Sequence, residues 1–123
     1  MNIVISNTSA VPIYQQIVDQ ISAQIIKGEL PSDFCLPPIR TVAKELRISV
    51  ITVKRAWEEL EHDGFIYTMV GKGCFVASLA PNALDAKRTA LANEKLTKDM
   101  EYYKTLGLSL DEIVAMIKHN YGE

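Results

Sequence analysis

The sequence has 123 residues and a formal net charge of −2. This length suits one domain with its own hydrophobic core, or one small domain with an appendage. The small acidic excess excludes a protein that coats nucleic acid indiscriminately, because that mode of binding needs a large surplus of lysine and arginine. Local charge must therefore decide whether any part of the chain meets an anionic partner.

The two cysteines, Cys35 and Cys74, do not form a Cys-x-x-Cys motif, and the sequence has no secretory leader or long apolar run. We therefore expect a cytoplasmic protein with reduced cysteines and no membrane association. Packing as small hydrophobic side chains is the simpler role for both cysteines, since neither lies in a sequence context that would stabilise a thiolate.

The first amphipathic segment follows Pro12. Its apolar residues recur at steps of three and four, which places them on one helix face. Proline suits the first turn of a helix, and Gly28 can adopt the left-handed backbone that follows a last turn. The pattern predicts a helix over residues 13–26 with a core face of Tyr14, Ile17, Val18, Ile21 and Ile25.

A second short helix is predicted after Leu36-Pro37-Pro38, because the prolines restrict the backbone there. Arg40 faces outward on it, and Arg47-Ile48 makes a short connection to the next element. The buried stripe of this helix is predicted to be Ile39, Val42, Ala43 and Leu46.

Ser49 is placed to cap a third helix by accepting a hydrogen bond from a free backbone N–H of the first turn. On a helical wheel, Lys54, Arg55 and Ile51 lie away from the apolar side. Trp57 is interpreted as a packing anchor, with stacking on a nucleic-acid base as the alternative. The predicted core face of this helix is Val53, Ala56, Trp57 and Leu60.

The pattern changes after Gly64, which ends the helix. Residues 65–69 and 74–77 have strand propensity and flank a turn at residues 70–73. Three short helices followed by a hairpin is the order of a winged helix-turn-helix, in which the third helix lies in the DNA major groove and the hairpin approaches the backbone or minor groove. The sequence thus predicts a mostly α fold, with a winged helix-turn-helix domain over residues 8–78.

Charge is unevenly distributed along these helices. Between Leu36 and Trp57 five basic residues accompany a single acid, Glu45, and the acids follow toward the far end of the third helix. Positive charge therefore lies where phosphates would be. Ordinary surface pairing is the alternative, Lys54 with Glu58 and Arg55 with Glu58 or Glu59. The basic residues are Arg40, Lys44, Arg47, Lys54 and Arg55.

The run LPPIRTVAKELRISVITVKRAWEELEHDGFIYTMVGKGCFVA resembles the DNA-binding module of the GntR family of bacterial transcriptional regulators. The family pattern is LPS-x-R-x-LA-x-x-L, a turn, T-V-x-x-A-x-x-x-L-x-x-x-G-x-I and G-x-G-x-F-V, and the similarity spans roughly residues 12 to 78. The resemblance implies DNA contact by Arg40, Ser49, Thr52, Lys54 and the Gly71-Lys72-Gly73 tip.

The chain departs from that pattern at two positions. Pro38 replaces the usual serine, and Val50 stands where many members carry an arginine that reads guanine. Since Val50 and Ile51 are both apolar, the first turn of the third helix could meet thymine methyl groups instead. The complete set of candidate DNA-binding residues is Arg40, Ser49, Val50, Ile51, Thr52, Lys54, Arg55, Gly71, Lys72 and Gly73.

Residues 79–123 are predicted to form a linker and two helices. The linker is Ser78–Asn82, a long helix covers about residues 83–104, and Gly107 interrupts it. Ser109 and Glu112 fit a capping box that starts the last helix, with Leu108 and Ile113 as a hydrophobic staple.

Two amphipathic helices of this size cannot close a core alone, so they need the winged domain or a second copy of the chain. The short tail resembles the dimerisation unit of the YtrA-like subfamily. This implies a homodimer that binds an inverted-repeat operator in double-stranded DNA, most simply as a repressor. The predicted dimerisation residues are Leu84, Leu91, Leu96, Met100, Tyr103, Ile113, Val114, Ile117 and Tyr121.

Enzymatic function is not expected. Gly71-Lys72 is followed by Gly73, where a phosphate-binding loop needs serine or threonine, and His62 and His119 lack metal-ligand spacing. No cofactor is predicted. One subunit offers no room for a conventional small-molecule pocket, and any effector is unknown. The alternatives are a protein-interaction module without salt-sensitive DNA affinity, and a ligand-responsive sensor with a pocket at the dimer interface.

Overall fold

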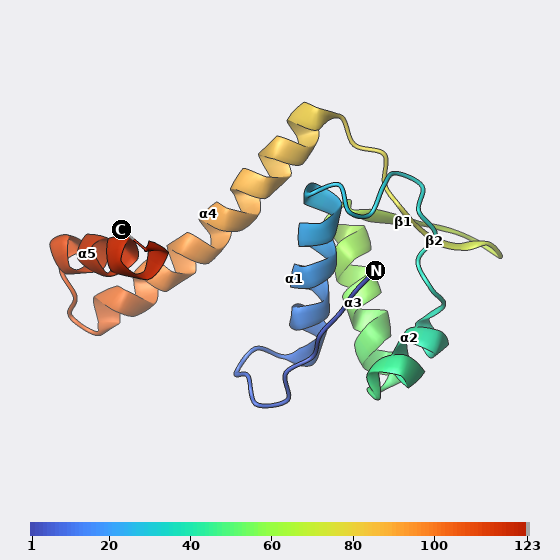
Figure 1. Ribbon diagram of the computed structural model, residues 1–123, viewed down its shortest axis with the longest axis horizontal. Helices are drawn as coiled ribbons and strands as arrows, with labels where there is room; N and C mark the ends of the chain where they lie inside the picture. Colours follow the sequence, from blue (N-terminus) through green and yellow to red (C-terminus); the bar gives the residue numbers. More distant parts are fainter. Residues whose placement is uncertain (123) are drawn as a thin grey trace. The chain divides into compact units, whose positions relative to one another are not determined.

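The computed structural model describes residues 1–122. Within that range the chain forms five α-helices and one two-stranded antiparallel hairpin (Figure 1). It divides into two compact units, one of residues Met1–Pro81 and a second that begins at Asn82. The predicted mostly α fold, a winged helix-turn-helix followed by two helices, is confirmed. The elements are α1 (Ile13–Ile26), α2 (Ile39–Leu46), α3 (Val50–His62), β1 (Ile66–Met69), β2 (Gly73–Val76), α4 (Pro81–Thr105) and α5 (Leu110–Tyr121).

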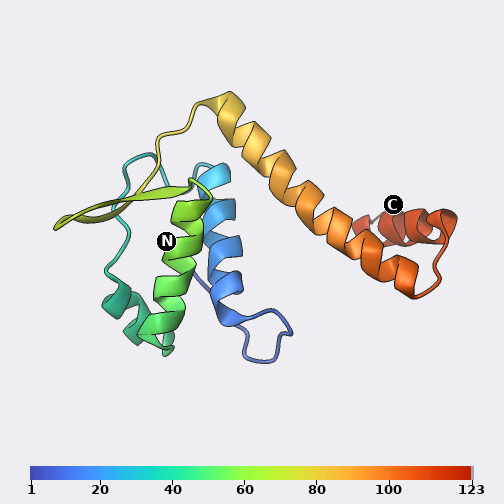
Figure 2. The same cartoon turned by 180° about the vertical axis from the view of Figure 1, so that it is seen from behind.

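The core of the first unit lies between α1 and α3, which run side by side in both views of the chain (Figure 2). Trp57 is only 3% exposed, so its prediction as a packing anchor is confirmed. On α2, Val42 and Ala43 are buried, while Ile39 and Leu46, predicted to be buried, are half-buried at the ends of this short helix. The side chains with no exposed area at the centre of the core are Ile17, Ile21, Val53, Ala56 and Leu60.

The turn between α2 and α3 is fixed by local backbone chemistry. Arg47 ends α2 with a left-handed backbone, φ 57° and ψ 47°. The Ser49 hydroxyl then accepts a hydrogen bond from the Thr52 backbone N–H at 3.1 Å, which is the predicted N-cap. The Ser49 and Thr52 hydroxyls also bind each other at 2.6 Å. These contacts set the point at which α3 begins.

The hairpin has a third main-chain neighbour that the sequence did not indicate. Strand β1 pairs with β2 from Ile66 opposite Val76 to Met69 opposite Gly73. The loop before α2 pairs with the other edge of β2, since the Leu36 N–H donates to the Cys74 carbonyl at 2.8 Å and the Val76 N–H donates to the Phe34 carbonyl at 2.9 Å. The base of the wing is therefore tied to the segment that starts α2.

The strand bounds differ by one residue from the prediction. Gly73, assigned to the turn, is the first residue of β2, which leaves residues 70–72 as the turn. Gly71 has φ +78° and Gly73 has φ +115°, conformations that side-chain-bearing residues rarely adopt. Below the tip, the Tyr67 hydroxyl donates to the Asp33 carboxylate at 2.8 Å, which raises the pKa of Tyr67.

The segment before α1 is held by three glutamines spaced one helical turn apart. The Gln20 side-chain amide accepts from the Val4 N–H at 2.9 Å and donates to the Val4 carbonyl at 2.7 Å. Gln24 binds Asn2 in the same two-way manner, and Gln16 binds Ser6. The bound residues of the N-terminal segment are two apart, which in an extended chain is about 6.6 Å, and the glutamines are four apart, which in a helix is about 6 Å. Each glutamine therefore lies level with its partner.

The second unit contains α4 and α5. Helix α4 begins at Pro81, two residues earlier than the predicted start, because proline is well tolerated in a first turn. The predicted capping box of α5 is present: the Ser109 hydroxyl accepts from the Glu112 N–H at 3.2 Å, and the Glu112 carboxylate accepts from the Ser109 N–H at 3.0 Å. These hydrogen bonds lower the pKa of Glu112, the backbone one most. Ile113 is the buried residue of α5.

Candidate nucleic-acid interface

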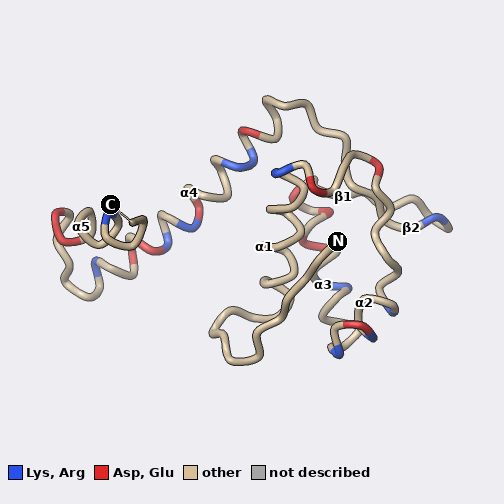
Figure 3. The backbone as a smooth tube through the Cα atoms, in the orientation of Figure 1, with Lys and Arg blue, Asp and Glu red and all other residues tan. Residues whose placement is uncertain are grey.

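Most basic residues of the α2–α3 pair lie on α2 and the first half of α3, and acidic residues follow toward the other end of α3 (Figure 3). The basic group is Arg40, Lys44, Arg47, Lys54 and Arg55, and all five are exposed. The acidic residues Glu58, Glu59, Glu61 and Asp63 are exposed as well. The charge separation in the sequence is therefore a separation on the surface, and it favours approach of an anionic partner to the first half of α3.

Lys54 makes the surface pair that was the alternative to DNA contact. Its Nζ lies 3.9 Å from a carboxylate oxygen of Glu58, and the two side chains are 64% and 66% exposed. A pair this exposed contributes at most about 1 kcal/mol and is screened by salt. It therefore leaves Lys54 free to exchange Glu58 for a phosphate at little cost.

Arg55 has a different neighbour from either one foreseen. Its guanidinium carbon lies 3.8 Å from the centre of the Tyr14 ring, in a cation–π contact that joins α3 to α1. Within residues 1–122 it forms no ion pair, so the alternative to DNA contact, pairing with Glu58 or Glu59, does not occur. Tyr14, predicted on the core face, is half-buried beneath this side chain.

The first turn of α3 presents two apolar side chains to solvent. Val50 is 45% exposed and Ile51 is 78% exposed. Ser49 and Thr52 flank them, and their hydroxyls share one hydrogen bond, so one hydroxyl hydrogen of the pair remains free to donate outward. The turn thus offers apolar contacts between two hydroxyl groups, a combination suited to thymine methyls beside phosphates.

The wing tip is a tight turn with an exposed cation. The Lys72 N–H donates to the Met69 carbonyl at 2.9 Å, and Gly71 supplies the left-handed backbone. The Lys72 side chain is exposed and takes part in no ion pair within the described residues. Val70, which is not among the predicted DNA contacts, is 98% exposed. An apolar residue at a turn carries no pattern by itself, so only the structure reveals it.

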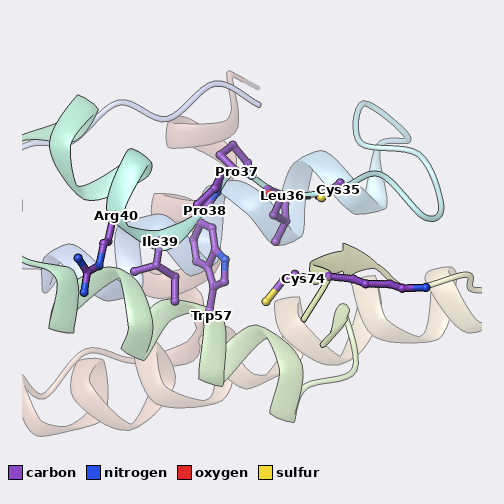
Figure 4. Close-up of a pocket in the computed structure, with 10 residues that line it drawn as sticks. Cys35, Leu36, Pro37, Pro38, Ile39, Arg40, Trp57 and Cys74 are labelled. Carbon is purple, nitrogen blue, oxygen red and sulfur yellow. Dashed lines mark hydrogen bonds between the residues drawn. The ribbon is translucent and has the colours of Figure 1, made fainter. Parts of the chain in front are cut away.

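An open hollow of about 350 Å³ lies between the start of α2 and the wing (Figure 4). Its walls are mainly apolar, and Figure 4 shows the Trp57 ring beside Pro38 and Ile39. Arg40 and Lys72 both line it. Its volume reaches the lower end of small-molecule sites, about 300 Å³, but such sites enclose most of their ligand and this hollow is open, so the absence of a conventional pocket in one subunit stays a prediction. The shared lining also brings two candidate DNA contacts, far apart in sequence, to one surface.

The residues predicted for dimerisation differ in exposure within the second unit. Ile113 is buried, and Leu84, Leu91, Met100 and Tyr103 are half-buried. Further exposed apolar side chains of the unit lie outside the predicted set; they include Tyr102, Leu106, Leu110 and Met116. The exposed members of the predicted set are Leu96, Val114, Ile117 and Tyr121.

Residues 13–76, more than half of the chain, match the model of the bacterial regulatory proteins of the gntR family. The chain belongs to the GntR family. It is therefore a DNA-binding transcriptional regulator, and the prediction of regulatory rather than enzymatic function is confirmed by this membership. No group of three or more histidine, cysteine, aspartate or glutamate side chains within residues 1–122 could hold a metal ion.

A curated relative shares nearly the whole length of this GntR-family chain. The HTH-type transcriptional regulator YhcF of Bacillus subtilis is 34% identical over 110 residues, which are 89% of this chain and 90% of that protein. The similarity thus includes the two-helix tail as well as the winged unit.

Solved structures show the same extent of similarity. A transcriptional antiterminator from Listeria monocytogenes has a TM-score of 0.74 at 30% identity, with 98% of this chain and 90% of that chain covered. YtrA from Sulfolobus acidocaldarius, a GntR-family transcription factor, has a TM-score of 0.64 at 32% identity, with 97% and 96% covered. The prediction of a YtrA-like member of the family is confirmed.

The winged unit alone resembles a protein solved with DNA. The DNA-binding domain of AraR, in complex with operator ORR3, has a TM-score of 0.52 at 26% identity, with 63% of this chain and 93% of that chain covered. Among the helices of residues 1–122, none is both long and apolar enough to cross a membrane.

Proposed function

We propose that this GntR-family regulator is a cytoplasmic homodimeric repressor, and that it binds an inverted-repeat operator through two winged units. The observation that carries the proposal is the charge separation along α2 and α3, which leaves the first half of α3 basic and exposed in a chain that is acidic overall. Similarity of the winged unit to the AraR DNA-binding domain, which was solved in complex with operator ORR3, supports operator binding.

In this proposal α3 enters the major groove and the wing lies against the backbone or minor groove. Arg40, Lys54, Arg55 and Lys72 neutralise phosphates, and these contacts supply most of the affinity. The one hydroxyl hydrogen that the Ser49–Thr52 pair leaves free donates to the DNA backbone beside them. Val50 and Ile51 supply the base readout, because their exposed methyl groups can pack against the methyl group of thymine. They cannot make the bidentate hydrogen bonds by which an arginine reads guanine.

The second unit is proposed to join two copies. Its exposed apolar side chains on α5, among them Val114, Ile117 and Tyr121, have no partner within the unit that would cover them. A winged helix reads only a few base pairs, so a regulator gains affinity and specificity by holding two at a fixed separation. Dimerisation through α4 and α5 would provide that separation without any ligand-binding domain.

Selection of bound sequences from a random duplex pool is the direct test of the function. We expect an enriched inverted repeat rich in A·T pairs at the positions that face α3. A gel-shift titration of that duplex in increasing salt should show a linear fall of log affinity with log salt. An absence of any enriched sequence together with an absence of salt-sensitive binding would favour the protein-interaction alternative.

Truncation tests the role of the second unit. A chain ending near Leu79 should be a folded monomer with greatly reduced operator affinity, because each winged unit would then bind its half-site alone. Joining two truncated copies through an artificial dimeriser should restore much of the loss, because the second contact again becomes intramolecular. Sedimentation of both lengths measures the oligomeric state. A truncated chain that still dimerises would move the interface into the winged unit.

A further inference from the structure

Tyr14 is the one aromatic residue of α1, and Arg55 covers its ring. Arg55 lies one helical turn after Ile51, on the exposed side of α3. It thus lies on the same helix face as Ile51, the most exposed apolar residue of the first turn. The contact at 3.8 Å connects this face to the first turn of α1, a segment that the sequence analysis left out of the interface.

The stacked guanidinium keeps its hydrogen-bonding capacity. Its five N–H donors point outward in the plane of the group, while an aromatic ring covers only a face of that plane. A phosphate can therefore still be bound in a bidentate manner along the edge. On α1, no carboxylate of the first turn can take the place of a phosphate on the Arg55 guanidinium, because that turn contains no acid. The Asp19 carboxylate, one turn further on, accepts a hydrogen bond from the Gln15 amide at 2.8 Å.

The ring itself rests on an anchored backbone. The first turn of a helix tends to fray, and α1 has no side-chain cap. The Gln16 amide compensates, because it donates to the carbonyls of Ser6 and Val11 at 3.0 Å and 2.8 Å and so fixes the chain on both sides of the entry loop. Tyr14 is therefore a fixed support for a long and otherwise mobile side chain.

We propose that Tyr14 is a positioning residue for DNA binding: it holds the Arg55 guanidinium in advance at the place where its in-plane donors meet a backbone phosphate beside the first half of α3. The inference rests on the proposed function and names a contribution that α1 makes to it. An arginine side chain loses conformational entropy when it is fixed on a phosphate. Because stacking on Tyr14 already restricts the Arg55 side chain, less entropy remains to be lost when DNA binds.

A double-mutant cycle on the full chain tests the inference, with the operator duplex obtained by selection as the probe. Tyr14→Leu removes the ring, Tyr14→Phe keeps it as the matched control, and Arg55→Ala removes the guanidinium. We expect Tyr14→Leu to weaken binding about three- to tenfold, and Tyr14→Phe to bind within about twofold of the original chain. In the Arg55→Ala background, Tyr14→Leu should cause no further loss.

The salt dependence supplies a readout that a merely structural role would not give. Arg55→Ala should reduce the slope of log affinity against log salt by about one per subunit, since a phosphate contact is lost. Tyr14→Leu should leave the slope unchanged, because the contact survives and only its prior ordering is lost. If Tyr14→Leu does not fold, Tyr14→Met replaces it, since methionine fills irregular space in a helix.

Two results would overturn the inference. One is an additive cycle, in which Tyr14→Leu weakens binding equally with and without Arg55. The other is an Arg55→Ala chain with original affinity and slope. Lys72→Ala separates these outcomes from failure of the proposed function: if it weakens binding while the cycle is additive, only the role of Tyr14 fails. If the original chain binds no duplex in a salt-sensitive way, the proposed function fails and the inference with it.

Discussion

Ser49 combines two roles that one pair of substitutions can separate. Its hydroxyl caps α3 through the Thr52 N–H at 3.1 Å, and it is a candidate contact to a phosphate. Ser49→Ala removes the cap, at a cost of about 1 kcal/mol. The winged unit has the size of a domain in which about 1 kcal/mol corresponds to a fall of about 4–8 °C in Tm.

Ser49→Asp should have the opposite effect on stability. Aspartate is as good an N-cap as serine, and its charge interacts favourably with the helix N-terminus by about 0.3–1 kcal/mol. The same charge should oppose DNA. For a carboxylate held about 6 Å from a phosphate, Coulomb's law gives about 0.7 kcal/mol at the dielectric constant of water and about 3 kcal/mol at an effective value of 20. Binding should therefore weaken about three- to a hundredfold per subunit.

The assays report the two effects separately. Trp57 is the single tryptophan of the chain and is buried in the winged unit, so its fluorescence follows the melting of that unit alone. Operator affinity is measured by gel shift. Ser109 provides the matched control, since it is the N-cap of α5 in the second unit, and Ser109→Asp should leave the affinity unchanged. If Ser49→Asp raises Tm and binds the operator like the original chain, the first turn of α3 does not face a phosphate.

Three further predictions concern the wing, the base contacts and the tail. Lys72→Ala should weaken binding about equally on all duplex sequences and lower the salt slope by about one per subunit, as measured by gel shift at several salt concentrations; a sequence-dependent loss would indicate base contact instead. Replacing thymine by uracil at one operator position should weaken binding, and Ile51→Ala should abolish that difference; indifference to the methyl group at every position would exclude this readout. The lowered pKa of Glu112 means that its contribution to stability is present above the unfolded pKa and is lost as pH falls through the folded value. Helicity of the tail, followed by circular dichroism, should therefore drop on acidification below the usual carboxyl range, and less so in Glu112→Gln.

Features that depend on local patterns could be predicted from the sequence. The bounds of α1 agree to the residue, since Pro12 and the apolar repeat mark them. Both serine caps, at Ser49 and Ser109, were recognised from the residue types that follow them. Trp57 was assigned to the core by its helical phase alone. In each case the information lies within about one helical turn of the residue.

Contacts between side chains and main-chain atoms far apart in the sequence could not be predicted. The glutamine amides of α1 bind carbonyl and N–H groups that every non-proline residue carries, so nothing in residues 2–6 identifies them as partners. The same holds for the loop that pairs with β2. The sequence offered Arg55 only neighbours three or four positions away as protein partners, whereas Tyr14, which it contacts, comes from another helix. The identities of the residues that contact DNA remain predictions.

The glutamines of α1 also bear on how the interface holds its shape. A recognition helix needs its phosphate-binding cations at fixed positions before DNA arrives, because every side chain ordered on binding lowers the affinity. In this chain Arg55 depends on Tyr14, Tyr14 depends on the first turn of α1, and that turn depends on Gln16 and the segment it holds. Under the proposed role of Tyr14, residues well outside the third helix determine how firmly one of its cations is placed. Changes in residues 2–11 should accordingly alter operator affinity without touching DNA.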